Sequence, residues 1–317
     1  AIDRALRQGS PVTVTDTNRR RLTLLSGSAP TTSHTLSQGE VLGRAIPSLF
    51  ARAGSQSVAW FPSATRLYSS TSSSLDGFEP AFRAANAFDG DPATAWWTGA
   101  GAADATGNWV RADLRTPTEI SRIEVDSAEA VGPARRASRV SVRLSDGSST
   151  SIALVEGSGM VEVRPRRTTS IEVRIDAVEG GGIAPVGLRE IRVRGLDLQE
   201  RIQLPDDLFR AARGVPSLAA ALERAPVAYQ FERAQADGGT DVERVVRRRF
   251  RTAGARRYRA SGVVRLDTST SDEVVDAVIG GTVGAWGSSR VGGLLVHRGG
   301  LAVDGRLDTG WIAEAEE

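Results

Sequence analysis

Oxygen-bearing side chains are concentrated in residues 86–97, Asn-Ala-Phe-Asp-Gly-Asp-Pro-Ala-Thr-Ala-Trp-Trp. Asp89 and Gly90 favour a tight turn, because glycine tolerates a positive φ and aspartate can accept a hydrogen bond from the nearby backbone. Thr94 adds a hydroxyl, and Trp96 is an apolar anchor for the loop. A hard cation such as Ca²⁺ takes about six to eight oxygen ligands. The stretch therefore predicts either a calcium-binding loop or an ordinary Asp-Gly turn beside a buried tryptophan.

A second copy of this pattern stands at residues 302–311, Ala-Val-Asp-Gly-Arg-Leu-Asp-Thr-Gly-Trp. Four residue types recur at the spacing of the first copy, namely Asp304, Gly305, Thr309 and Trp311. Chance rarely repeats four specified residues at fixed spacing, so we infer two homologous modules.

The first copy and the following Gly107-Asn-Trp-Val-Arg-Ala-Asp-Leu114 together resemble the discoidin domain, also called the coagulation factor V/VIII type C domain. The sugar-binding relatives of that domain are carbohydrate-binding modules. The resemblance covers roughly residues 58–197 and only the opening half of a second copy at the C-terminal end. It implies a mainly β fold, an antiparallel β-sandwich of the discoidin-like jelly-roll type.

The resemblance also implies a ligand set for a structural Ca²⁺. In discoidin-like sugar-binding modules a glutamate near the start of the final strand closes the loop onto the metal, and Glu190 stands at that place. Carried over by resemblance, the ligands would be the side chains of Asp89, Thr94 and Glu190 and the backbone carbonyls of Asn86, Asp91 and Arg189. Some discoidin domains bind no metal, so a loop held by hydrogen bonds alone remains the alternative.

A sugar site needs an aromatic platform and polar groups in a shallow pocket. Related modules place this site among the loops at one end of the sandwich. Our candidates are Trp97, Arg135, Arg136 and Tyr68. For Trp97, a second core contact beside Trp96 is an equal alternative.

Catalytic chemistry finds little support in the sequence. There is no cysteine, and the two histidines, His34 and His297, have no acidic partner marked by spacing. The pair Asp206 and Asp207 opens a predicted helix, where acidic residues interact favourably with the helix dipole. Spacing does not exclude a carboxylate pair for glycoside hydrolysis, because such pairs form in three dimensions. We expect this segment to be non-catalytic.

Length and charge limit the number of domains and the class of partner. A chain of 317 residues suggests two or three domains. The 40 basic residues against 38 acidic ones leave a net charge of +2, which argues against a nucleic-acid partner. No apolar run approaches the ~20 residues that cross a bilayer.

Period-two alternation predicts the strands of the sandwich. Ile171, Val173 and Ile175 share one face of such a strand, as do Val140 and Val142. From these patterns we expect five segments: the tail of an upstream domain at 1–25, a linker at 26–57, the discoidin-like β-sandwich at 58–197, a helical connector at 198–227, and a second β-rich region with the start of another discoidin-like module at 228–317.

The order of Thr15-Asp-Thr-Asn-Arg-Arg-Arg21, a discoidin module, Leu204-Pro-Asp-Asp-Leu208 and a second discoidin start is similar to the extracytoplasmic region of actinobacterial α-(1→3)-arabinofuranosyltransferases. This resemblance implies an accessory part that binds cell-wall polysaccharide, arabinan or galactan, on the periplasmic side or at the cell surface. The catalytic membrane domain would lie outside this chain. The alternatives are a binding module of a secreted glycoside hydrolase and a discoidin-type surface adhesion protein.

Overall fold

The computed structural model describes residues 2–16, 35, 56–71, 82–99, 105–128, 135–231, 246–263, 266, 270–279, 284–291 and 294–313. Most of the expected linker 26–57, including His34, lies outside these residues. The chain divides into two compact units, Ala1–Ala234 with Val245–Gly254 and Gln235–Arg244 with Ala255–Glu317. None of the described helices has the length and apolar character needed to span a membrane.

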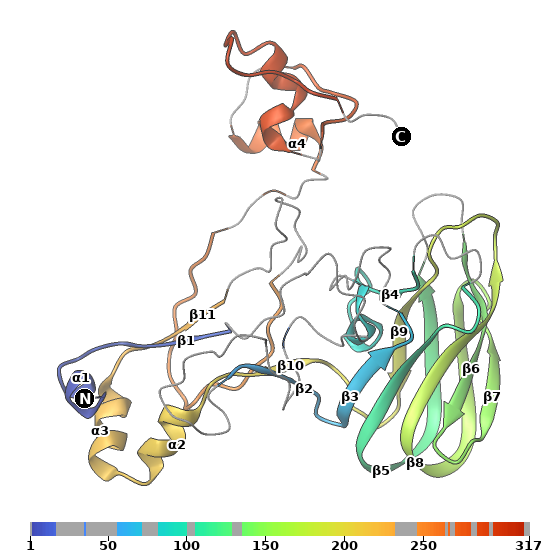
Figure 1. Ribbon diagram of the computed structural model, residues 1–317, viewed down its shortest axis with the longest axis horizontal. Helices are drawn as coiled ribbons and strands as arrows, with labels where there is room; N and C mark the ends of the chain where they lie inside the picture. Colours follow the sequence, from blue (N-terminus) through green and yellow to red (C-terminus); the bar gives the residue numbers. More distant parts are fainter. Residues whose placement is uncertain are drawn as a thin grey trace. The chain divides into compact units, whose positions relative to one another are not determined.

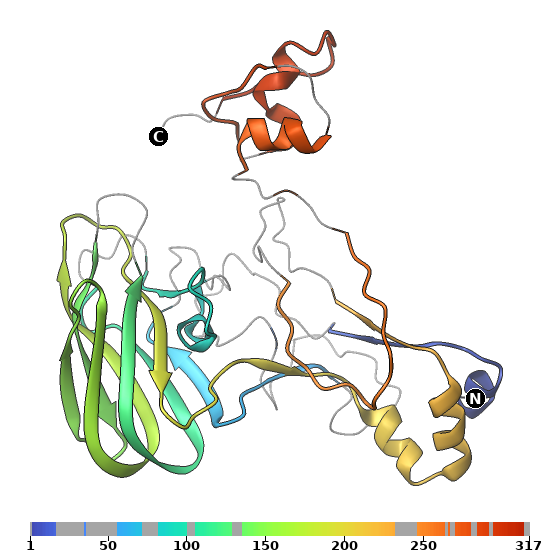
Figure 2. The same cartoon turned by 180° about the vertical axis from the view of Figure 1, so that it is seen from behind.

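A seven-stranded antiparallel sheet forms the β-sandwich of the first unit (Figures 1 and 2). Its strands are β3 (Ala64–Ser69), β4 (Trp96–Trp97), β5 (Trp109–Ala128), β6 (Arg136–Leu144), β7 (Ser149–Ala153), β8 (Ser158–Glu179) and β9 (Gly187–Val193). The strand order is β4-β9-β5-β8-β6-β7, and β3 pairs with β5. The predicted antiparallel β-sandwich is confirmed.

Two long strands, β5 and β8, allow the sheet to fold over on itself. The first part of β5 pairs with β3, and its last residues, 123–128, pair with β9. The register between β5 and β8 shifts between Asp113 and Thr118, where the two strands bend together. The sandwich therefore encloses one continuous apolar core that reaches from Phe61 to Leu198.

The period-two alternation of the sequence builds that core. Val140, Val142 and the predicted inward residues of β8 are almost completely buried. A tight turn at Gly147, with a φ of 82°, returns β6 into β7. Trp96 is fully buried, and its Nε1 donates a hydrogen bond of 2.8 Å to the carbonyl of Thr71. The loop before Trp96 is therefore anchored to the core as predicted.

Outside the sandwich, the described residues of the first unit form two short strand pairs and three α-helices. The pairs are β1 (Val12–Thr15) with β11 (Val227–Gln230), which are parallel, and β2 (Val58–Trp60) with β10 (Arg201–Gln203), which are antiparallel. The helices are α1 (Ile2–Arg7), α2 (Asp207–Arg213) and α3 (Pro216–Arg224). β2 precedes the sandwich in the chain, but it pairs with β10, which follows the sandwich.

These elements outside the sandwich bring together segments that we expected to be separate. The segments 1–25 and 198–227 do not stand apart, because Leu6 of α1 packs in one apolar cluster with Ala212 of α2 and Leu222 of α3. They share a small core in which Val14, Ile202 and Leu204 are buried. Long-range pairing of this kind leaves no local pattern in the sequence.

The second unit is built around α4 (Asp272–Ile279), with the 3₁₀ helices η4 (Leu295–His297) and η5 (Gly299–Ala302). The Asp272 carboxylate accepts hydrogen bonds from the backbone N–H groups of Gly287 (3.1 Å) and Gly299 (2.7 Å) and pairs with Arg290. The described residues of this unit contain no strand, although we expected a β-rich region at 228–317.

Candidate functional site

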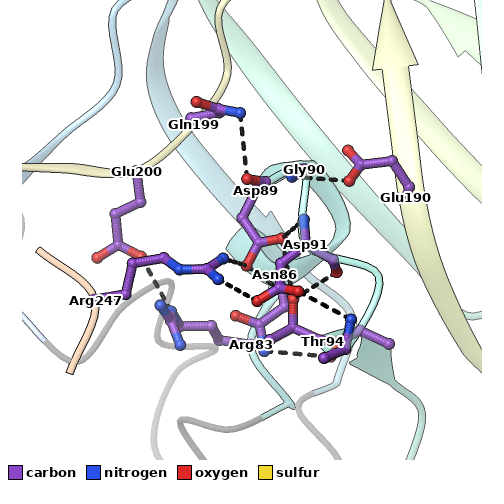
Figure 3. A network of polar contacts seen from close by, with 12 residues as sticks. Arg83, Asn86, Asp89, Gly90, Asp91, Thr94, Glu190, Gln199, Glu200 and Arg247 are labelled. Atoms are coloured by element: carbon purple, nitrogen blue, oxygen red, sulfur yellow. Dashed lines mark hydrogen bonds and ion pairs between the residues drawn. The ribbon is translucent and has the colours of Figure 1, made fainter. Parts of the chain in front are cut away.

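The Asp89 loop folds around the carboxylate of Asp89 (Figure 3). Asp89 Oδ1 accepts hydrogen bonds from the Asp91 N–H (2.9 Å) and the Thr94 hydroxyl (3.0 Å), and Oδ2 is 2.8 Å from the same hydroxyl. Gly90 has a φ of 73°, which a residue with a Cβ adopts only with strain. The predicted Asp-Gly turn is present in this loop.

Glu190 closes the loop from the neighbouring strand β9. Its Oε2 accepts a hydrogen bond of 2.8 Å from the Gly90 N–H, 100 residues away in the sequence. Gln199 adds a second tie, since its Nε2 donates to the Asp89 carbonyl at 3.2 Å. The loop and the final strand of the sandwich are therefore brought together, as the resemblance implied.

Two buried carboxylates meet here, and their pKa values respond to burial. Burial raises the pKa of Asp89, although hydrogen bonds from the Asp91 N–H and the Thr94 hydroxyl oppose the rise. Burial also raises the pKa of Glu190 to about 7; the Gly90 N–H opposes this, and the negative charges of Asp89 and Asp126 add to it. Burial therefore disfavours the ionised forms of both carboxylates at this loop.

The six residues implied as calcium ligands lie in or beside this loop. Asn86 is buried in η2 (Ala84–Phe88), and its Nδ2 donates to the Ala95 carbonyl at 3.3 Å. Arg189 precedes Glu190 and lines a cleft of about 490 Å³ with Gly90 and Pro92. Only oxygen donors are available here, which fits a hard cation. Among the described residues no group of three acidic, histidine or cysteine side chains is arranged to hold a metal, so such an ion would depend on carbonyl and hydroxyl oxygens.

An arginine that we did not predict for this site provides positive charge at the loop. Arg247 pairs with Asp91, and its Nη1 lies 3.8 Å from Asp89 Oδ2 (Figure 3). It comes from the triple-arginine run Arg247–Arg249. No spacing rule links residue 247 to residue 89, so no local pattern could have indicated this pairing. The Arg247 guanidinium therefore supplies positive charge to Asp89 and Asp91, as a bound cation would.

The second Asp-Gly loop repeats the hydrogen bonds of the first. Asp304 Oδ1 accepts from the Arg306 N–H (2.9 Å) and from the Thr309 hydroxyl (2.9 Å), and Gly305 has a φ of 78°. Trp311 Nε1 donates to the Ser289 carbonyl at 2.8 Å, as Trp96 donates to Thr71. Trp311 is 41% exposed, however, whereas Trp96 is fully buried. The second loop therefore has the local geometry of the first without its packed core.

The predicted sugar-site residues divide into two groups. Trp97 pairs with Gly187 in the sheet, and Arg135 Nη1 donates to the Ala184 carbonyl at 2.9 Å, so both contact the segment 184–187. Arg136 forms an ion pair with Glu179, at the end of β8 that leads into this segment. These three residues lie at one end of the sandwich.

Tyr68 lies on β3 in a different cluster. Its ring packs edge-on against Trp109 at a centroid distance of 5.4 Å, and the Arg66 guanidinium lies 4.2 Å from the ring centre. Burial, followed by the charge of Asp113, raises the pKa of Tyr68. Tyr68 is on β3, which pairs with β5, whereas Trp97 is on β4, which pairs with β9.

Trp97 is held in place while remaining half-buried. A Cβ on Gly187 would lie 2.8 Å from Cδ2 and Cε3 of the Trp97 indole, so the ring lies directly against the backbone of β9. Phe82 packs edge-on against Trp97 at a centroid distance of 6.3 Å. Trp97 therefore has core contacts and keeps part of its surface open, which combines the two alternatives considered for it.

Comparison with known proteins gives a match for the sandwich. Residues 67–203 match the family described as arabinofuranosyltransferase D, third carbohydrate binding module. The matched segment runs from β3 to β10 and includes the Asp89 loop and Glu190. It is therefore a module related to that one, and the resemblance predicted from the sequence is confirmed for this segment. No curated protein matches the chain.

Solved structures that match the chain include arabinofuranosyltransferase AftD from Mycobacteria, with 22% identity over 64% of this chain and a TM-score of 0.45. The chain spans 17% of that protein's length. Chitosan-binding module 1 of a chitosanase/glucanase from Paenibacillus sp. IK-5 is 21% identical, with coverage of 41% of this chain and 94% of the module, and a TM-score of 0.32. The CBM32 of AlyQ, in complex with 4,5-unsaturated mannuronic acid, is 12% identical, with coverage of 42% and 95% and a TM-score of 0.30.

Proposed function

We propose that the β-sandwich is a non-catalytic module that holds cell-wall polysaccharide, arabinan or galactan, for a larger membrane-bound arabinofuranosyltransferase. The family match over residues 67–203 carries this proposal, because it spans the whole sheet from β3 to β9. The module would act on the extracytoplasmic side, in an actinobacterial type of cell wall. The catalytic membrane domain would belong to other parts of the protein.

The binding surface we propose is the end of the sandwich that carries Trp97, Arg135 and Arg136. The half-buried indole of Trp97 offers an aromatic surface for a sugar ring, and the partly exposed Arg136 places hydrogen-bond donors on the same rim. Arg135 is buried and supports the rim from below instead of facing a ligand. Arg135 is already anchored to the Ala184 carbonyl, so the rim is preorganised. A tethered module of this kind needs only weak affinity, because tethering raises the local concentration of the polysaccharide.

Calcium is the second part of the proposal. The side chains of Asp89, Thr94 and Glu190 would bind Ca²⁺ together with the carbonyls of Asn86, Asp91 and Arg189. The meeting of the Asp89 and Glu190 carboxylates at the loop supports this, because burial raises the pKa of both groups and a bound cation would favour their ionised forms. The ion would fix the loop to β9 and so hold the neighbouring strand β4, which carries Trp97.

A glycan array separates this proposal from its alternatives. We expect the 317-residue chain to bind arabinan or galactan oligosaccharides and Trp97→Ala to lose most of that binding. As a matched control, Trp109→Phe changes an aromatic residue of the Tyr68 cluster and should bind as the wild type does. Binding only to chitosan-type glycans would favour a module of a secreted hydrolase. A Trp97→Ala variant that binds arabinan normally would move the site away from this rim.

A further inference from the structure

A second cleft lies outside the sandwich, among elements to which the proposed function assigns no role. It has a volume of about 760 Å³ and is lined by residues of β2, β10, α2, β11 and the segment 248–253. All of these belong to the first unit, and all of the lining residues are described by the structure. The cleft is distinct from the Asp89 loop and from the rim around Trp97.

Aromatic side chains from four separate segments line this cleft. They are Trp60, Phe209, Tyr229 and Phe250. The Tyr229 and Phe250 rings lie 5.2 Å apart, and Phe250 also packs 4.8 Å from Phe231. Aromatic walls with a few placed polar groups are typical of small-molecule sites.

The polar lining is strongly basic. Five arginines contribute to it, against one acidic residue, Asp206. Two of the arginines are neutralised: Arg201 pairs with Asp197 and Arg248 with Asp16. The other three form no ion pair with any residue that the structure describes, namely Arg213, Arg249 and Arg251. The whole chain has a net charge of only +2, so three uncompensated cations at one cleft are a marked local excess.

The segment that carries Arg249 and Arg251 is fixed in position. The Ile202 N–H donates to the Arg249 carbonyl at 2.8 Å, and the Ala253 N–H donates to the Tyr229 hydroxyl at 2.9 Å. The Arg248–Asp16 pair at the base is almost fully buried. The Arg251 guanidinium also lies 5.7 Å from the centre of the Trp60 ring. These contacts hold the backbone of the segment in place and put the Arg251 charge beside the Trp60 ring. Arginines on an ordinary solvated surface need no such positioning.

We propose that this cleft binds an anionic saccharide, a sugar that carries a phosphate or a carboxylate group. Arginine is suited to both groups, because its planar guanidinium donates two parallel hydrogen bonds to adjacent oxygens. The sugar ring would lie against Trp60 and Tyr229, and the anionic group would face Arg249 and Arg251. This site is independent of the polysaccharide rim, so either one can fail without the other.

Isothermal titration of the 317-residue chain tests the proposal. The probes are glucose 1-phosphate and trigalacturonate, with glucose and inorganic phosphate as the neutral and sugar-free comparisons. The test variant is Arg249→Gln with Arg251→Gln. The control, Arg4→Gln with Arg224→Gln, removes the same charge from two exposed arginines on α1 and α3.

We expect at least one anionic saccharide to bind at millimolar concentration, and to bind more tightly than either glucose or inorganic phosphate. The Arg249/Arg251 variant should lose at least about tenfold in affinity, and the control should match the wild type. The phosphate and carboxylate probes together identify which anionic group is preferred.

Several results would overturn the proposal. They are no binding of either anionic saccharide, equal binding of inorganic phosphate or glucose, and equal losses in the test and control variants. A thermal melt of each variant shows that it is folded. If the test variant were unfolded, added salt provides the second test: affinity of the wild type must fall as salt screens the arginines, and constant affinity would contradict the proposal.

Discussion

Replacing Glu190 with glutamine gives the sharpest test of the electrostatics at the Asp89 loop. Glutamine keeps an oxygen that can accept the Gly90 N–H, which donates to Glu190 at 2.8 Å, and removes the carboxylate charge. Burial raises the pKa of Glu190 to about 7, from an ordinary value of 4.5. The folded protein therefore holds the Glu190 proton more tightly than the unfolded chain does.

The direction of the pH effect follows from this difference. The stability that protonated Glu190 contributes is complete below about pH 4.5 and is lost as the pH rises through about 7. At higher pH the buried, ionised carboxylate costs about 3 kcal/mol. Glutamine carries no such cost, so at pH 8 without metal Glu190→Gln should be more stable than the wild type, by up to about 3 kcal/mol. For a unit of this size that corresponds to roughly 6–12 °C in Tm.

Thermal unfolding between pH 4 and pH 8, in chelator and in excess Ca²⁺, is the assay. In chelator the wild-type Tm should fall across the window from pH 4.5 to 7, and the variant should show little of this fall. In Ca²⁺ at pH 8 the wild type should recover and the variant should not respond. A variant less stable than the wild type at pH 8 in chelator would refute the electrostatic reasoning, and a wild-type Tm that ignores Ca²⁺ would remove the calcium proposal.

Three further changes test the packing and charge of the site. Gly187→Ala should lower the free energy of unfolding, measured in urea, by about 1–3 kcal/mol, because the new Cβ would lie 2.8 Å from the Trp97 ring. The control Gly181→Ala should lower it much less, because its Cβ would have no neighbour within 4 Å. Thr94→Val should destabilise the protein by about 1 kcal/mol in the same assay, because the hydroxyl that lies within hydrogen-bond distance of both Asp89 carboxylate oxygens is lost. An unchanged unfolding midpoint would contradict this. Arg247→Gln should lower the Ca²⁺ concentration needed to raise the Tm, because a competing cation is removed, and a higher requirement would show that the arginine assists the metal instead.

The sandwich could be predicted from the sequence because its signals are local. Alternation at Val140 and Val142 fixes which face of β6 is buried, and Gly147 marks the turn that follows. The recurrence of the Asp-Gly loop at Asp304 identified a second loop whose hydrogen bonds repeat those of the first. Such features need only neighbours within about ten residues in the chain.

Other features could not be predicted, because they depend on long-range pairing. The parallel pairing of β1 with β11 joins residues that are more than 200 positions apart, and no pattern in either strand names its partner. The placement of Arg247 at the Asp89 loop has the same origin. The separation of Tyr68 from Trp97 reflects where β3 and β4 lie in the sheet, since β3 pairs with β5 and β4 with β9. The sequence indicated Tyr68 and Trp97 as candidates for a sugar site, but it could not show which candidates lie close together.

The most direct test of the central proposal is a titration of the 317-residue chain with arabinan oligosaccharides, with and without Ca²⁺. We expect weak, saturable binding that Ca²⁺ strengthens and that Trp97→Ala abolishes. Absence of binding to both arabinan and galactan under either condition would contradict the account.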